Sequence, residues 1–226
     1  MCGRYSFSAS KDKLGAQFKF LDNIGPLIEQ FNIAPTQKAY VITDEHPAQL
    51  QLFTWGLIPF WAKDRSMGSR MINARSETAM SKPAFREAFK KRRCWVLADS
   101  FYEWKKEGKK KQPYRIFLKN GSLLAFAGLW ETWRSGDEEL QSFTILTTSP
   151  NAEVASIHDR MPVILPHPEQ QYAWFHDRTL EASQLLLQPI ASGALDMYPV
   201  YPKVNKVRNQ GPELHKPIDK QGNLFD

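Results

Sequence analysis

The sequence predicts an α+β fold, a single domain in which a few helices flank a curved, largely antiparallel and barrel-like β-sheet. Segments rich in β-branched or aromatic residues, typical of strands, recur along the chain. Helical segments are fewer, and they are inserted between strands without the regular alternation of a parallel α/β fold. A chain of 226 residues can bury one sizeable core and is short for two. One domain is therefore expected.

Strand character is found in seven segments between residues 39 and 165. They are Ala39–Thr43, Leu50–Trp55, Cys94–Ala98, Pro113–Leu118, Leu123–Trp130, Ser142–Thr147 and Pro162–Leu165. Asn120-Gly121 lies between the fourth and the fifth segment and suits a two-residue hairpin turn. The sequence therefore predicts that these two strands are antiparallel neighbours.

The clearest helix is expected over residues 82–91, where apolar side chains fall on one face. Ser81 would cap this helix, and Pro83 would lie in its first turn. Residues 168–175 and 180–187 are predicted to form two further helices by the same reasoning.

Composition favours a basic globular protein with an anionic partner. The formal net charge is +6 and the isoelectric point is about 9.2, which fits nucleic acid. No apolar run is long enough for a membrane helix or a signal peptide, so we expect a soluble cytoplasmic protein, associated with the nucleoid in a bacterium. Cys2 and Cys94 are expected to stay reduced, and with the scattered histidines they have no metal-ligand spacing, so neither metal nor cofactor is expected.

Cys2 attracts attention through its position. Removal of Met1 would leave a cysteine with a free α-amine beside its thiol. An α-amine titrates near pH 8 and a lysine near 10.4, so at neutral pH roughly a tenth of the amine is nucleophilic. With an aldehyde this amine would form a Schiff base, and the thiol could then close a thiazolidine ring. The alternative is that Cys2 is merely a small residue after the start methionine.

Six short motifs occur in order along the chain. They are Met1-Cys2-Gly3-Arg4-Tyr5, Asn32-Ile33-Ala34-Pro35-Thr36, Trp55-Gly56-Leu57-Ile58-Pro59, Asn73-Ala74-Arg75-Ser76-Glu77-Thr78, Phe101-Tyr102-Glu103-Trp104 and His158-Asp159-Arg160-Met161-Pro162. Together they resemble the SOS-response-associated peptidase (SRAP) family, and Val204-Asn205 fits as well.

The resemblance implies one SRAP domain over residues 1–226, with a core of about 2–208. The tail of about 209–226 is expected to be irregular, because it contains Asn209, Gly211, Pro212, Pro217 and Gly222. The resemblance implies a protein that crosslinks to abasic sites in single-stranded DNA during the DNA damage response and protects them. We expect this protein to be a monomer. The resemblance also implies an autoproteolytic step that exposes Cys2, and an abasic-site lyase activity. No membrane partner is implied.

Three further catalytic residues follow from the resemblance. Asn73 would orient Cys2 or the opened sugar, although an asparagine also suits a turn or cap. Glu103 would be the acid-base group, with a pKa raised by its aromatic neighbours, unless it faces outward from its strand. His158 would assist ring opening or reversal of the crosslink, although a lone histidine is more often structural.

Binding of the DNA strand requires cations and aromatic rings. Guanidinium groups bridge phosphate oxygens, and aromatic rings stack on bases without reading sequence. Core packing is the alternative for the adjacent rings of Phe60 and Trp61, but neighbouring residues on an extended segment face opposite sides, so one should escape the core. The DNA-binding residues expected are Arg4, Pro35, Phe60, Trp61, Arg75, Lys82 and Arg160.

A lysine-rich run and the second cysteine have simple structural interpretations, and two other functions are compatible with the sequence. The run Lys105–Lys111 is interpreted as a solvated hairpin tip, although it resembles a nucleic-acid patch, and Cys94 as a buried small hydrophobe. A cysteine peptidase with a dyad of Cys2 and His158 is the first alternative function. A module that binds single-stranded DNA without a covalent bond is the second.

Overall fold

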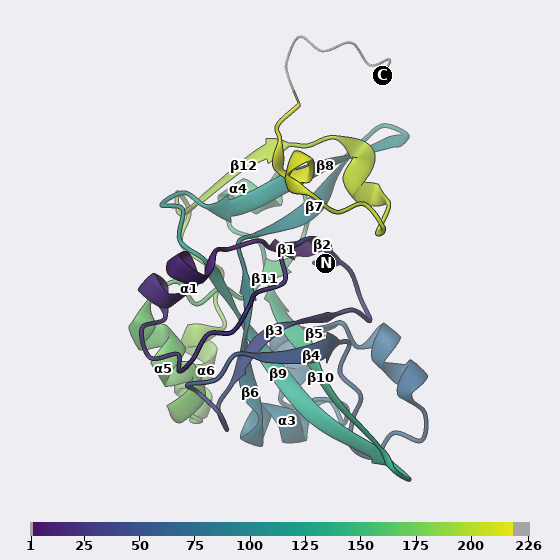
Figure 1. The fold of residues 1–226 in the computed structure, drawn as a ribbon, viewed down its shortest axis with the longest axis vertical. Coiled ribbons are helices and arrows are strands. Elements are labelled where there is room, and N and C mark those ends of the chain that lie inside the picture. The colour runs from purple at the N-terminus through teal and green to yellow at the C-terminus, as the bar shows by residue number, and fades with distance from the viewer. Residues whose placement is uncertain (1, 219–226) are drawn as a thin grey trace.

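The structure, a computed structural model, describes residues 2–218 and contains two β-sheets that meet near the N-terminus (Figure 1). The first sheet has five antiparallel strands, and the second has seven, of which two pairs are parallel. The first sheet runs in the order β12 (Leu195–Pro199), β8 (Lys110–Leu118), β7 (Ser100–Glu107), β1 (Tyr5–Phe7) and β2 (Gln30–Ile33).

The second sheet closes on itself. Strands β4, β3, β6 and β9 pair in that order, and β10 pairs with both the first and the last of them. The closed ring consists of β10 (Glu138–Thr148), β4 (Gln51–Trp55), β3 (Lys38–Thr43), β6 (Arg93–Ala98) and β9 (Leu124–Ser135). Two short strands, β5 (Asn73–Arg75) and β11 (Met161–Pro162), add to β10. The expected α+β fold with a barrel-like, largely antiparallel sheet is confirmed.

The helices are short and lie around the strands, most of them beside the second sheet (Figure 1). The α-helices are α1 (Lys11–Gln17), α2 (Ser76–Ala79), α3 (Arg86–Lys91), α4 (Ala152–Ala155), α5 (Pro168–His176) and α6 (Leu180–Leu186). The 3-10 helices are η1 (Arg65–Arg70), η2 (Pro202–Asn205) and η3 (Pro212–His215). Among the described residues, no helix has the length and apolar character needed to cross a membrane.

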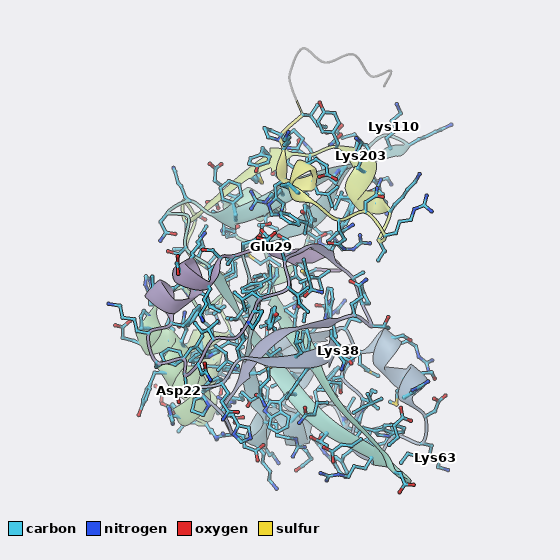
Figure 2. All side chains as sticks on the ribbon, viewed as in Figure 1. Asp22, Glu29, Lys38, Lys63, Lys110 and Lys203 are labelled. Atoms are coloured by element: carbon cyan, nitrogen blue, oxygen red, sulfur yellow. The ribbon has the colours of Figure 1, made fainter. Side chains whose placement is uncertain are left out.

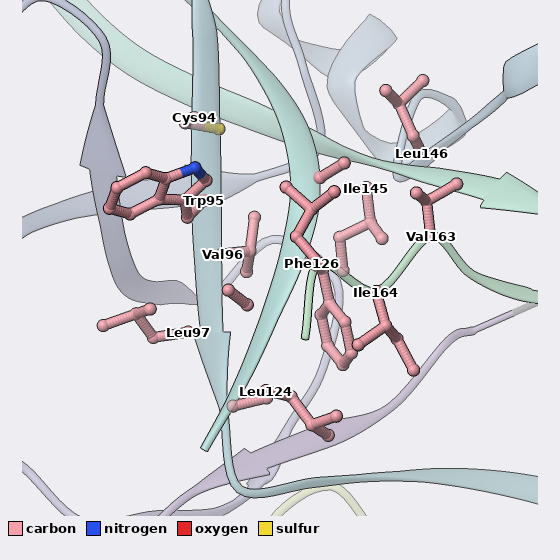
Figure 3. Close-up of a cluster of buried hydrophobic side chains, with 14 of the residues drawn as sticks. Cys94, Trp95, Val96, Leu97, Leu124, Phe126, Ile145, Leu146, Val163 and Ile164 are labelled. Carbon is pink, nitrogen blue, oxygen red and sulfur yellow. The ribbon is translucent and has the colours of Figure 1, made fainter. Parts of the chain in front are cut away.

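Strand β6 is buried on both faces, and it supplies much of the core that Figure 3 shows. Cys94 is fully buried and forms no disulfide, as expected for a small hydrophobic residue. Gly128 on β9 lies opposite Cys94, and a Cβ atom there would lie 2.8 Å from the Cys94 Sγ. The absence of a side chain at Gly128 therefore allows β6, β9 and β10 to pack closely in the barrel.

The prediction that Asn120-Gly121 joins two neighbouring antiparallel strands in a hairpin is wrong. A tight turn does form there, with the Gly121 amide donating to the Leu118 carbonyl and Gly121 in the left-handed region. However, β8 belongs to the first sheet and β9 to the second, so the two strands are not neighbours. The turn leads the chain from one sheet into the other, while the hairpins join β7 to β8 and β9 to β10.

The helix expected over residues 82–91 starts later than predicted, because α3 begins at Arg86. The residues before it form turns, in which the Phe85 amide donates to the Lys82 carbonyl. Ser81 is not a cap, because its hydroxyl donates to the Thr78 carbonyl. The helices expected at 168–175 and 180–187 are confirmed as α5 and α6.

Five strands were not among the seven segments predicted, and four of them, β1, β2, β5 and β12, have five residues or fewer. The fifth, β7, is highly charged at its end. In the segment expected to be irregular, residues 212–215 form η3 and Leu214 is buried. Pro217 bridges to Val200, which fixes this segment on the first sheet. The rest of the expected tail, residues 219–226, lies outside the described residues.

Candidate functional site

Cys2 lies just before β1, where the two sheets meet, and it is fully buried. The Nδ2 of Asn73, at the start of β5, donates a 2.7 Å hydrogen bond to the Cys2 carbonyl. This bond joins the N-terminal segment of the first sheet to a strand of the second. Asn73 therefore holds the backbone of Cys2, and its buried Oδ1 has no hydrogen-bond partner among the described residues.

The Cys2 thiol is held in its neutral form. Burial raises the pKa of the thiol well above its ordinary value, and the negative charge of Glu103 adds to this increase. The Sγ lies 3.8 Å from the Arg4 carbonyl, which accepts its weak hydrogen bond. A base that removes the thiol proton is therefore needed before the sulfur can act as a nucleophile.

Glu103 and His158 come together from different elements. Glu103 lies on β7, whereas His158 follows α4 in a loop that leads into β11. Glu103 Oε2 lies 3.9 Å from His158 Nε2, and the glutamate is only 3% exposed. Burial raises the pKa of Glu103 above its ordinary value, while a positive charge on His158 would lower it. A carboxyl group of this kind exchanges protons closer to neutral pH than an exposed one.

The His158 ring is oriented by its own loop. The backbone N–H of Arg160 donates a 3.0 Å hydrogen bond to Nδ1, which places the ring proton of a neutral imidazole on Nε2, facing Glu103. Asp159 Oδ1 also lies 2.8 Å from Nδ1 and would favour the other tautomer. Its side chain is 87% exposed, and an exposed pair of this kind contributes little, so we assign the tautomer from the backbone donor.

The four expected catalytic residues thus lie at the meeting point of the two sheets. Cys2 and Glu103 come from the first sheet, and Asn73 and His158 from segments attached to β10 in the second. The site offers a neutral thiol, a buried carboxyl group with a raised pKa, an imidazole and an amide. Such a set can move protons to and from the oxygen, nitrogen and sulfur atoms of a reaction in which a carbonyl carbon is attacked beside Cys2.

Arg4, two residues after Cys2, is half-buried. Its Nη1 donates to Asn32 Oδ1 at 2.7 Å and to the Val204 carbonyl at 2.8 Å. Its guanidinium carbon lies 5.9 Å from the centre of the Trp104 ring. These contacts fix Arg4 between β2, β7 and η2, so a phosphate would have to share a group that already has protein partners.

Arg160 also has strong protein partners. Its two terminal nitrogens pair with the Glu77 carboxylate at 2.6 and 2.9 Å, and Nη2 donates to the Thr147 carbonyl at 2.5 Å. The Arg160 hydrogen bonds lower the pKa of Glu77. This ion pair connects the loop of His158 to α2, directly after the strand that carries Asn73. The phosphate role expected for Arg160 remains a prediction.

Phe60 and Trp61 are both exposed, at 53% and 48%. The expectation that one ring escapes the core rested on an extended segment, but the two residues lie in a turn between β4 and η1. Neither ring is packed in the core, and both are available to an external partner. Arg75 and Lys82 are exposed as well.

Pro35 is half-buried and lies in the turn that connects β2 to β3. The Gln37 amide donates to the Ala34 carbonyl across this turn, and Thr36 adopts a φ of 70°. A β-branched residue in the left-handed region is strained, and such strain is often found at functional sites. The turn therefore keeps Pro35 and Thr36 in one arrangement beside the barrel.

Sequence reasoning missed the roles of two residues within the quoted motifs. Asn32 is fully buried and contacts Arg4 and three carbonyl groups of the C-terminal segment, and Glu77 is the partner of Arg160. An asparagine between apolar neighbours at the end of a strand is a weak signal for such a role. The position of Glu77 in the same motif as Asn73 is the only signal for its pairing.

Comparisons with known proteins find similar sequences over nearly the whole chain. The profile of the SOS response associated peptidase (SRAP) family matches residues 1–207. The abasic site processing protein YoqW of Bacillus subtilis is 42% identical over 222 residues, which cover 95% of this chain and 98% of YoqW. The abasic site processing protein YedK of Escherichia coli is 32% identical over 228 residues, covering 96% of this chain and all of YedK.

A solved structure has a similar fold. The crystal structure of a protein from Bacteroides thetaiotaomicron superposes with a TM-score of 0.85 at 29% sequence identity. The match covers 96% of this chain and 99% of that one. The two sheets and their connections are therefore shared with a protein that has been solved by crystallography.

Proposed function

The chain belongs to the SOS response associated peptidase (SRAP) family, and from this premise we propose that it captures abasic sites in single-stranded DNA through Cys2. The reacting group of the substrate is the aldehyde of the ring-opened sugar. The observation that carries the proposal is the position of Cys2, buried beside Asn73 and near the pair of Glu103 and His158. The product is a thiazolidine that joins protein and DNA.

The first step needs the α-amine of Cys2, which becomes free when Met1 is removed. The amine attacks the aldehyde carbon, and loss of water leaves a Schiff base. Because an α-amine titrates near pH 8, it reacts at neutral pH more readily than any ordinary lysine. The hydrogen bond from Asn73 to the Cys2 carbonyl keeps this residue in one orientation, which lowers the entropic cost of the attack.

The second step closes the ring. The sulfur adds to the imine carbon, the thiol proton leaves to Glu103, and the imine nitrogen gains a proton as it becomes an amine. The overall change is loss of one water from aldehyde and aminothiol. The raised pKa of Glu103 makes its carboxylate a better base for this thiol, whose own pKa is raised. His158 can return a proton to Glu103 or take one from it.

The same groups would serve the finer activities of this proposal. An autoproteolytic removal of Met1 would use the Cys2 thiol with Glu103 as its base. A lyase step would use the Schiff base before ring closure, with His158 moving a proton of the sugar. The autoproteolytic step depends on the Cys2 thiol, whereas the lyase step depends on the α-amine. Cys2→Ala removes only the thiol, so it should abolish the first activity and leave the Schiff base of the second possible.

The decisive experiment is incubation of the purified protein with single-stranded DNA that contains one abasic site. We expect a protein-DNA band that survives denaturation and disappears in Cys2→Ala. The matched control is Cys94→Ala, which removes the other cysteine from the core and leaves the N-terminus unchanged. Loss of the band in both variants, or its persistence in Cys2→Ala, would refute capture by Cys2.

Intact mass spectrometry supplies the second measurement. The proposal requires that the active protein lack Met1, so its mass should correspond to residues 2–226. A protein that retains Met1 and still forms the band would contradict the thiazolidine.

The alternative of a cysteine peptidase that acts on other proteins is less well supported. Peptidase cysteines usually have a lowered thiol pKa, whereas burial and Glu103 raise the pKa of Cys2. Digestion of an unstructured polypeptide, unaffected by abasic DNA, would favour the peptidase. Binding of abasic DNA by the wild-type protein under native conditions, with no band after denaturation, is the result expected of a non-covalent binding module.

A further inference from the structure

A basic surface lies at the end of the first sheet, away from the barrel. We call it the hairpin surface, and it combines the tip of the β7–β8 hairpin with η2 and the residues after it. Lys105 is half-buried and the other side chains are exposed. The hairpin surface consists of Lys105, Lys106, Lys109, Lys110, Lys111, Lys203, Lys206 and Arg208.

The two parts of the hairpin surface are joined by hydrogen bonds. The Trp104 indole donates to Asn205 Oδ1 at 2.8 Å, and Gln112 Nε2 donates to the Val200 carbonyl at 2.8 Å. Figure 2 shows Lys110 and Lys203 at the same end of the molecule. Cations that are about ninety positions apart in the sequence therefore belong to one surface.

The charge of the hairpin surface is not neutralised. Glu107 is the only acidic residue within 105–111 and 200–208, so the local excess of seven positive charges exceeds the net charge of +6 for the chain. Among the described residues, none of the eight cations forms an ion pair. The rest of the protein is thus close to neutral, and this end alone accounts for its basic character.

The strand register also has an unfavourable pair of charges. Lys106 and Lys111 lie directly opposite each other on β7 and β8. Like charges in this position destabilise a hairpin, and only the next pair, Glu107 with Lys110, is complementary. An anionic partner would relieve this repulsion. Tyr201, which is 40% exposed and directly precedes η2, adds a ring on which a base could stack.

The hairpin surface begins next to the candidate site, because both lie on β7. Glu103 is followed by Trp104, which Arg4 contacts, and then by the lysines. From Glu103 to Glu107 the strand advances by about 13 Å. A stacked DNA strand covers that distance in about four nucleotides.

We propose that the hairpin surface binds phosphates of the DNA strand that carries the abasic site, starting about four nucleotides from the lesion on one side. This inference rests on the proposed function, because it assumes that the DNA strand bound by the hairpin surface is the one whose abasic site reacts with Cys2. The lysines hold phosphates without reading sequence, and they extend the contact beyond the nucleotide that reacts. The exposed hairpin tip predicted at Lys105–Lys111 is thereby assigned a DNA strand as its partner.

The test variant is the triple substitution Lys109→Gln, Lys110→Gln and Lys111→Gln. The matched control changes three exposed lysines at α1 and just after it, Lys11→Gln, Lys13→Gln and Lys19→Gln. Single-stranded oligonucleotides carry the abasic site with two nucleotides on each side, or with twelve on the 5′ side or on the 3′ side only. Crosslinking rates are measured at limiting protein and at two salt concentrations.

We expect the triple variant to crosslink about tenfold more slowly than wild type on one of the two long substrates at low salt. Its rate on the short substrate should equal that of wild type. The salt slope of binding should become shallower by about two, since each contact with a single strand contributes about 0.7. Equal rates for the triple variant and the control on both long substrates would overturn the proposal, as would an equal loss on the short one.

A second readout separates this proposal from the capture chemistry. Equilibrium binding of undamaged single-stranded DNA is measured in Cys2→Ala, with and without the triple substitution. If capture fails in wild type but the salt slope still depends on the three lysines, the proposed function is wrong and the hairpin surface still binds DNA. Loss of binding to phosphatidylserine vesicles, with an unchanged DNA slope, would assign the surface to a membrane and overturn the proposal.

Discussion

Replacement of Asn32 by alanine should destabilise the protein strongly, because one buried side chain connects the start of the chain to its C-terminal segment. Its Oδ1 accepts from Arg4, and its Nδ2 faces the carbonyls of Val204, Lys206 and Asn209 at 3.0–3.2 Å. An amide has only two N–H groups, so at most two of these three contacts are full hydrogen bonds.

The magnitude follows from this count. Two neutral hydrogen bonds contribute about 1 kcal/mol each, and the bond from the Arg4 guanidinium contributes about 1.5–3 kcal/mol. Asn32→Ala should therefore lower the free energy of unfolding by about 3–5 kcal/mol, a large share of the ~5–15 kcal/mol typical of a domain. The expected decrease in Tm is roughly 10 °C.

Urea unfolding followed by tryptophan fluorescence measures this change. The matched control is Asn205→Ala. Asn205 lies in the same C-terminal segment, and its replacement removes one exposed hydrogen bond, which the Trp104 indole donates. That variant should lose about 1 kcal/mol or less. A decrease below about 1 kcal/mol for Asn32→Ala as well would refute the view that Asn32 holds the C-terminal segment and Arg4 in place.

Three further predictions test the site and its surroundings. Glu103→Gln keeps the shape of the side chain and removes its proton exchange, so crosslinking should slow by about 10²–10⁴-fold; a change under tenfold in single-turnover kinetics would exclude it as the acid-base group. Phe60→Ala and Trp61→Ala should each weaken binding of undamaged single-stranded DNA by about 1–3 kcal/mol, measured by fluorescence anisotropy, if the exposed rings stack on bases. His215, whose pKa burial lowers from 6.5 to about 4, binds a proton more readily in the unfolded state. Stability should therefore be lost as pH falls from about 6.5 to about 4, by up to about 3 kcal/mol. Denaturation curves of His215→Gln should show a flatter pH dependence in that window, and an unchanged slope would contradict the assignment.

The charged neighbours of His215 act on its pKa in opposite directions: Asp99 raises it, whereas Arg115 lowers it together with burial. Asp99, 3.9 Å from the imidazole, has a pKa below its ordinary value despite its burial, because His215 and hydrogen bonds from Ser6 and Ser8 favour the carboxylate. Arg115, whose guanidinium lies 3.6 Å from Asp99, opposes protonation of His215. The stability contributed by Asp99 is present above its unfolded pKa and is lost at still lower pH.

The candidate site could be predicted as a set of residues but not as an arrangement. The motifs around Cys2, Asn73, Glu103 and His158 are local, so they can be recognised in the sequence without knowledge of the fold. The contacts between them cross from one sheet to the other. Nothing in the spacing of the motifs indicates that Glu103 faces His158, since that depends on which sheet each segment joins.

Local sequence was enough to predict the fold class and the positions of most long strands, and it also indicated which reactive groups lie near the N-terminus. These properties depend on local composition, on strand propensity and on the type of residue at position 2. Tertiary structure alone decided that β8 and β9 belong to different sheets, despite the turn at Asn120-Gly121. It also brought Lys203 to the hairpin of Lys110. The physical reason is that strand partners are chosen by burial of side chains from the whole chain, which no short segment encodes.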